Sequence, residues 1–364
     1  MSTTTSKISD NLRIVWAIAA KDIVDAIKNK AILSTILSAL FLMVLYKVMP
    51  FLSDAGSPPR LALYDAGSSS LVARLESDAQ IDLREMPSRK SMEEYLGYEN
   101  TVVLGLVLPA DFDQALASNE QIELDGYVEH WASDAATGEI QSFFEEQLTK
   151  LTGTAVRINI ESDTVFTQLN GGQSFIFSLG MIVLLSMFGL SITANLILEE
   201  KHTKTLDALL ISPASGGQLV IAKALAGLFY CLVAAALILA FNAALVVHWG
   251  VVVLGVICAS MFTVALGLLL GSIFEVKQQL TLWGFILFQP LLLPVFFSMM
   301  DDLVPQSVIA VMRWIPTVAL GRVFRVALLD RAPWAQFGPQ LLYVAGWAVL
   351  VLAVVAWIVR RSDR

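Results

Sequence analysis

The segment Glu199–Ser215 reads EEKHTKTLDALLISPAS and lies between two long apolar runs, at residues 174–198 and 219–247. Each run is long enough to cross a bilayer, because about 20 apolar residues at ~1.5 Å rise per residue span the hydrocarbon core. The segment is therefore predicted to be a short polar connection between two membrane spans. It carries more charge and more patterning than a simple turn needs.

The middle of this connection is predicted to be a helix. Leu206, Leu209 and Leu210 have the i, i+3, i+4 spacing of one helix face, and Pro213 ends the pattern. Two interpretations remain open at this point. The helix either rests its leucines on the membrane surface or offers them to a cytoplasmic partner.

The composition is that of a membrane protein that crosses the bilayer several times. The chain has 364 residues, of which 56% are hydrophobic and only 15% charged, and its mean hydropathy is +0.68. The two cysteines, Cys231 and Cys258, both lie in apolar runs. They are predicted to be small packing residues rather than a disulfide.

The charge of the chain is unevenly distributed. Residues 53–172 contain 21 Asp and Glu against 7 Lys and Arg, a net charge of −14, whereas the remainder has a net charge of +6. An acidic insert is therefore combined with a basic membrane body. The basic residues are scattered along the predicted membrane edges, so nucleic acid is not an expected partner.

The N-terminal segment, residues 1–30, is predicted to contain an amphipathic helix in the membrane plane. Apolar residues recur at steps of three and four from Ile8 to Ile27, and Trp16 is a typical interface anchor, whereas residues 1–7 are expected to be irregular. Asp22 is assigned to the polar face.

The first predicted span, residues 31–52, is uncleaved, because it is longer than the apolar region of a signal peptide. Lys21, Lys28 and Lys30 precede it and Asp54 follows it. The positive-inside rule therefore places the N-terminus in the cytoplasm and the acidic insert outside.

The insert, residues 53–172, is predicted to be a small extracytoplasmic α/β domain, because strand and helix patterns alternate along it. The expected strands are 60–64, 81–85, 101–108 and 121–128, and the expected helices are 70–78, 91–96, 111–117 and 138–150. No catalytic constellation is recognisable in it. His130 is its only histidine and is interpreted as a packing or surface residue rather than a metal ligand.

Five further spans follow in residues 173–364, at 173–198, 219–247, 251–274, 280–300 and 340–359. Lys223 is expected to extend its side chain to the membrane surface from the inner end of the third span. Residues 301–338 carry Arg313, Arg322, Arg325 and Arg331 on an external segment and are predicted to form amphipathic helices at the outer leaflet. The fold class is thus an α-helical polytopic membrane protein with six transmembrane helices and both termini cytoplasmic.

The sequence contains no recognisable motif for nucleotide or metal binding. The sequence has no Gly-x-x-x-x-Gly-Lys-Ser/Thr, no His-Glu-x-x-His and no Cys-x-x-Cys, so no cofactor is expected. No carboxylate stands in the middle of a predicted span, which disfavours a carrier driven by protons or sodium. The polar residues within spans that could line a translocation path are Gln289, which precedes Pro290, and more weakly Asn195 and Asn242.

The central segment resembles the signature of ABC-2-type transporter permeases. The similarity rests on Glu199-Glu200-Lys201, Thr205-Leu206-Asp207, Leu209-Leu210, Ser212-Pro213 and the approach to Lys223. It departs from the usual pattern at His202, Asp207 and Ala222. The order of parts also agrees: an elbow helix, one span, a large external domain and five more spans.

This resemblance implies the membrane subunit of an ATP-binding cassette exporter that works as a homodimer or heterodimer with a separate ATP-binding subunit. Residues 199–212 would be the coupling helix seated on that subunit. The residues implied to make this contact are Glu199, Glu200, Lys201, Thr205, Leu206, Asp207, Leu209, Leu210 and Pro213. ATP would be hydrolysed in the partner, so this chain is not itself an enzyme.

The expected activity is export of a lipophilic or amphiphilic, drug-like or lipid-like substrate across the cell membrane. Two alternatives stay open: a sodium-export permease of the same family, and a membrane-anchored surface or receptor protein whose spans only hold the external domain.

Overall fold

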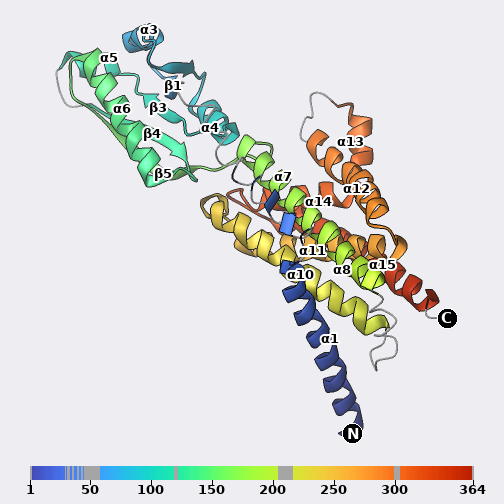
Figure 1. Cartoon of the computed structure of the whole chain (residues 1–364). Helices are drawn as coiled ribbons and strands as arrows, with labels where there is room; N and C mark the ends of the chain where they lie inside the picture. Colours follow the sequence, from blue (N-terminus) through green and yellow to red (C-terminus); the bar gives the residue numbers. More distant parts are fainter. Residues whose placement is uncertain are drawn as a thin grey trace.

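The structure is a computed structural model that describes residues 2–28, isolated helical positions between 30 and 44, and residues 58–118, 122–203, 216–298 and 304–362. Most of the predicted first span and the whole of 204–215 lie outside the described residues. The described chain forms two parts, an α/β insert domain (residues 58–170) and a helical bundle (residues 172–362), which lie end to end in Figure 1.

The insert domain is built around one five-stranded sheet. Its elements are β1 (Arg60–Asp65), α3 (Ser70–Glu76), β2 (Asp82–Glu85), α4 (Arg89–Tyr98), β3 (Leu104–Leu108), α5 (Phe112–Ala117), β4 (Ile122–Glu129), α6 (Asp134–Thr152) and β5 (Val156–Val165). The strand order is β2-β1-β3-β4-β5, in which only the β3–β4 pair is antiparallel. The predicted α/β domain is confirmed, and its position relative to a membrane stays a prediction.

Helices cover both faces of this sheet. Leu71 of α3, Phe112 of α5 and Phe144 of α6 are buried against one face, and Met92 and Leu96 of α4 are buried against the other. Side chains alternate between faces along a strand, so Leu61 and Leu63 of β1 join the first cluster and Ala62 joins the second.

The strand β5 was not predicted from the sequence. Val156, Ile158 and Ile160 alternate there with Arg157 and Asn159, and Val156 and Ile158 are buried. This period of two is the ordinary signature of a strand with one buried face. The signal was therefore present in the sequence.

The bundle consists of α7 (Gly172–Met187), η1 (Phe188–Ile192), α8 (Thr193–Thr203), α10 (Gly216–Phe241), η2 (Ala243–Leu245), α11 (Trp249–Ile273), α12 (Lys277–Phe297), α13 (Gln306–Met312), α14 (Pro316–Val326) and α15 (Trp334–Ser362). Among the described residues, five helices are long and apolar enough to cross a bilayer: the run through α7, η1 and α8, then α10, α11, α12 and α15. These correspond to the five spans predicted after the insert.

The predicted amphipathic helices between the last two spans are α13 and α14. They meet at a bend of 93°, which makes the pair either a broken span or a re-entrant loop. All residues of α14 except Arg322 are buried. Arg325, which belongs to the predicted amphipathic helices of the outer leaflet, is buried within the bundle.

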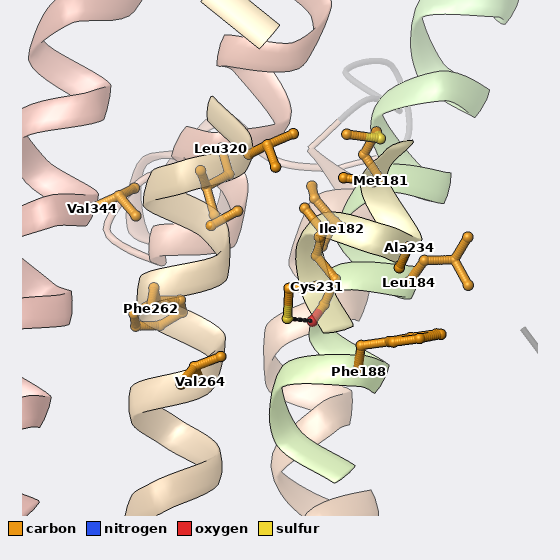
Figure 2. Close-up of a cluster of buried hydrophobic side chains, with 14 of the residues drawn as sticks. Met181, Ile182, Leu184, Phe188, Cys231, Ala234, Phe262, Val264, Leu320 and Val344 are labelled. Carbon is orange, nitrogen blue, oxygen red and sulfur yellow. Dashed lines mark hydrogen bonds between the residues drawn. The ribbon is translucent and has the colours of Figure 1, made fainter. Parts of the chain in front are cut away.

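The core of the bundle is apolar and closely packed. Figure 2 shows Met181, Phe188, Cys231 and Phe262, which belong to this core and come from α7, η1, α10 and α11. Cys231 is buried as predicted, and its Sγ lies 3.9 Å from the carbonyl oxygen of Leu185. Its role as a packing residue follows from this position.

The helix α1 (Ser2–Lys28) lies alongside the first half of α10, as Figure 1 shows. Val15 and Ala19 pack on Ala222, and the hydroxyl of Tyr230 donates a 2.5 Å hydrogen bond to the carbonyl oxygen of Ile23. The predicted helix is confirmed, although it begins at Ser2 and so includes the stretch expected to be irregular. Its orientation in a membrane stays a prediction.

Candidate functional site

The candidate site is the group of charged residues where α1, α8 and α10 meet. The Nζ atom of Lys223 on α10 lies 2.6 Å from Oε1 of Glu200 on α8 and 2.8 Å from Oδ2 of Asp22 on α1. The exposed fractions of the three residues are 1% for Lys223, 7% for Glu200 and 5% for Asp22. One ammonium group thus joins α8 and α10, which flank residues 204–215, to α1, which is distant in sequence.

This geometry corrects two sequence predictions. Lys223 does not extend to a surface, because its long side chain turns inward to two carboxylates. Asp22 is not on the polar face of α1, since it is buried against α10. An ionised group is costly to bury in an apolar interior unless it is paired, which explains why all three charges are found together.

The sequence did contain a signal for Asp22. Val15, Ala19 and Asp22 have the i, i+4, i+7 spacing of one helix face, and the first two are the apolar residues that α1 buries. A carboxylate on an apolar stripe predicts a buried cationic partner. Nothing local identified that partner as Lys223, 201 positions further along the chain.

Lys201 makes a second anchor at the same end of the bundle. Its Nζ atom donates to the carbonyl oxygens of Ser272, at 2.9 Å, and Phe274, at 3.1 Å. These carbonyls belong to the C-terminal end of α11, where the last carbonyls of a helix have no partner within the helix and a cation is favourable. Lys201 therefore ties α8 to α11.

The predicted contact residues are thus engaged in different ways. Glu200 and Lys201 bind within the chain, whereas Glu199 is exposed. The remaining residues of the predicted coupling helix, Thr205, Leu206, Asp207, Leu209, Leu210 and Pro213, lie outside the described residues. That these residues contact an ATP-binding subunit stays a prediction.

No hydrogen bond connects the described residues that are predicted to line a translocation path to one another. Asn195 on α8 donates to the carbonyl of Ser191, at 2.7 Å, and Asn242 donates to that of Ile238, at 2.8 Å, so each amide bonds its own helix. Gln289 is half-buried on α12.

Pro290 of α12 is exposed and lies beside a contact to the bent pair. The hydroxyl of Thr317, on α14, donates to the carbonyl oxygen of Leu291 at 2.5 Å. The proline-containing part of α12 is therefore held to α14. A role of Gln289 and Pro290 in a translocation path stays a prediction.

The opposite end of the bundle contacts the insert domain, and sequence reasoning did not identify the contacts of His130 and Arg325 there. Nε2 of His130 lies 3.4 Å from the carbonyl oxygen of Leu245, and the imidazole packs on Phe166 with ring centroids 5.0 Å apart. Arg325 on α14 donates to Oδ1 of Asn170 at 2.9 Å, in the connection between β5 and α7.

Next to this junction, at the end of β4, Glu129 is buried with an exposed fraction of 2%. Burial raises the pKa of its carboxyl to about 8, and Oε2 accepts a 3.5 Å hydrogen bond from the amide of Val103. Oε1 has no hydrogen-bond partner among the described residues. Burial therefore favours the protonated, neutral form of this carboxyl.

A sequence model of the family described as ABC-2 family transporter protein matches residues 30–357. The match includes the insert domain and the five long helices of the bundle. None of the curated proteins matches the chain.

Proposed function

The chain belongs to the ABC-2 family of transporters, and from this premise we propose that it is the permease subunit of an exporter that moves a lipophilic or amphiphilic substrate out of the cell. Members of this family are transmembrane subunits that work with a separate ATP-binding subunit, and they are not themselves catalytic. The direction of transport, the substrate class and a dimer of permeases are parts of the proposal.

The observation that carries the proposal is the family match across almost the whole chain, from residue 30 to residue 357. Two features of the structure support it. The helices on either side of 204–215 are tied to the bundle by buried charges, and a contact that receives mechanical work needs such rigid support. The exposed apolar side chains of α12, such as Leu282, Trp283 and Phe285, fit a bilayer environment.

The entry of energy through the predicted coupling helix is tested by the substitutions Leu206→Asp and Leu209→Asp. The matched control is Leu206→Met with Leu209→Met, which keeps apolar side chains of similar size. We expect the Asp variant to lose the co-purifying subunit, identified by its ATP hydrolysis, and to lose efflux of an amphiphilic fluorescent dye. An Asp variant that keeps both the ATPase and the efflux contradicts the proposed coupling.

The proposed direction is tested in vesicles of both orientations. An exporter accumulates the dye in inside-out vesicles supplied with ATP and not in right-side-out vesicles. Reporter fusions at both termini test the cytoplasmic placement of the ends. Normal function of a chain that lacks an active ATPase would instead favour a surface or receptor protein.

A further inference from the structure

The ionic contacts of Lys223 connect three packed elements, α1, α8 and α10, at one point. Glu200 stands on α8 before the segment 204–215, and Lys223 stands on α10 after it, so their 2.6 Å contact fixes the two helix ends relative to each other. Asp22 brings in α1 at 2.8 Å. No other buried ion pair is present among the described residues.

Neighbouring contacts extend the connection along α1 and α10. Gln218 donates to Oδ1 of Asn11 at 2.8 Å before the ionic contact, and Tyr230 bonds Ile23 after it. The apolar contacts of Val15 and Ala19 with Ala222 lie between them. The helix α1 therefore follows α10 over three turns or more, rather than touching it at one point.

A buried ionic contact fixes the relative position of the elements that it joins more than it stabilises the fold. Apolar residues of similar volume often stabilise an interior equally well, because burying charges carries a large desolvation cost. An apolar contact can slide, however, whereas an ammonium held between two carboxylates is satisfied in one arrangement. The buried charges therefore suit a contact that passes movement from one helix to the next without letting the helices slide past each other.

We propose that Asp22, Glu200 and Lys223 form an ionic joint that makes the cytoplasmic ends of α8 and α10 move together with α1. The three are positioning residues. The inference rests on the proposed function, in which a partner ATPase displaces this end of the bundle. A displacement of α8 is then passed on to α10 through the contact of Glu200 with Lys223. It is passed on to α1 through the contact of Lys223 with Asp22.

The joint is tested first without any ATPase, by distances between spin labels in the purified chain. One label pair joins Glu199→Cys to Gly217→Cys and reports on α8 and α10. The other joins Arg13→Cys to Ile221→Cys and reports on α1 and α10. All four positions are exposed, and Cys231→Ala with Cys258→Ala removes the native thiols.

Removing one carboxylate or the other should have opposite effects on the two distance distributions. Glu200→Met should broaden the α8–α10 distance distribution and leave the α1–α10 distribution narrow, whereas Asp22→Leu should do the reverse. Each variant leaves Lys223 with one carboxylate, so both are expected to fold. The exchange Asp22→Lys with Lys223→Asp keeps one ammonium between two carboxylates and should keep both distributions narrow.

A second measurement uses the complex with its ATPase. Asp22→Leu, which lies outside the predicted ATPase contact, should retain the bound ATPase and its basal ATP hydrolysis but lose dye efflux per ATP hydrolysed, and the charge exchange should recover it. Lys150→Met, which removes the exposed pair with Glu146 in the insert domain, is the matched control and should change neither quantity.

The outcomes separate this inference from the proposed function. Narrow distributions in both Asp22→Leu and Glu200→Met overturn the joint, whatever the ATPase does. Broadened distributions with unchanged efflux per ATP also overturn it. Failure of the Leu206 and Leu209 substitutions to release the ATPase contradicts the proposed coupling contact and leaves the distance result standing.

Discussion

The guanidinium of Arg325 donates a hydrogen bond of 2.9 Å to Oδ1 of Asn170, although the two residues are separated by 155 positions in the sequence. Arg325 is buried on α14, and Asn170 lies in the connection that leads from the insert domain into α7. The contact joins the bent pair α13–α14 to the base of the insert domain. A movement of either part therefore acts on the other.

Asn170→Ala removes the acceptor and should destabilise this junction. A hydrogen bond to a charged group contributes about 1.5–3 kcal/mol, and the guanidinium loses part of its compensation for burial. We expect faster amide hydrogen exchange in α14 and at the start of α7. Asn159→Ala, at an exposed position on β5, is the control. Equal exchange in the two variants contradicts a junction that depends on Asn170.

The buried carboxyl of Glu129 should make the insert domain less stable as pH rises. Its pKa is about 8 in the folded protein, against about 4.3 in an unfolded chain. Between these values the folded state keeps a proton that the unfolded state has released, so the free energy of unfolding falls with increasing pH and then levels above pH 8. The total change is on the order of a few kcal/mol.

Glu129→Gln keeps the shape of the side chain and removes the titration. Its amide exchange in β4 should therefore change less between pH 5 and pH 8 than that of the wild type, after correction for the intrinsic rate. Glu123→Gln, at an exposed position on the same strand, should retain the wild-type dependence. An unchanged dependence in Glu129→Gln would falsify the assignment.

Lys201→Met should loosen the C-terminal end of α11. It removes both hydrogen bonds to the carbonyls of Ser272 and Phe274, and each bond from a charged donor contributes about 1.5–3 kcal/mol. Hydrogen exchange over residues 270–276 measures the effect. Lys277→Met, at an exposed position on α12, is the control, and matching exchange in the two variants rules out the proposed cap.

The close approach of α11 to η1 requires glycine at residue 267. A Cβ atom there would lie 2.2 Å from the carbonyl oxygen of Gly189, so Gly267→Ala forces the two helices apart. Overpacking of this kind costs about 1–3 kcal/mol, and we expect a lower thermal unfolding midpoint in detergent. Gly250→Ala, in the same helix with no atom within 4 Å, should leave the midpoint unchanged; equal midpoints in both variants would contradict the packing argument.

Much of the architecture was predictable because its signals are local. Continuous apolar runs predicted the long helices and β3, local strand patterns predicted β2 and β4, and alternation at period two predicted β1. The same rule applied to Val156–Val165 finds β5 as well. The candidate site was only partly predictable. The motif led to Glu200 and Lys201, but their partners on α10 and α11 follow from packing between helices rather than from spacing within one segment.

The sequence alone was sufficient to predict a membrane protein with several spans and a transporter motif. Hydropathy and a short charged motif are local features that do not depend on tertiary contacts. The sequence alone did not predict the partners of Lys223. A lysine near the end of a span can lie at the surface or between carboxylates, and its local sequence is the same in both cases. The packing of α1 on α10 brings Asp22 to it, and the cost of burying an unpaired charge then determines the arrangement.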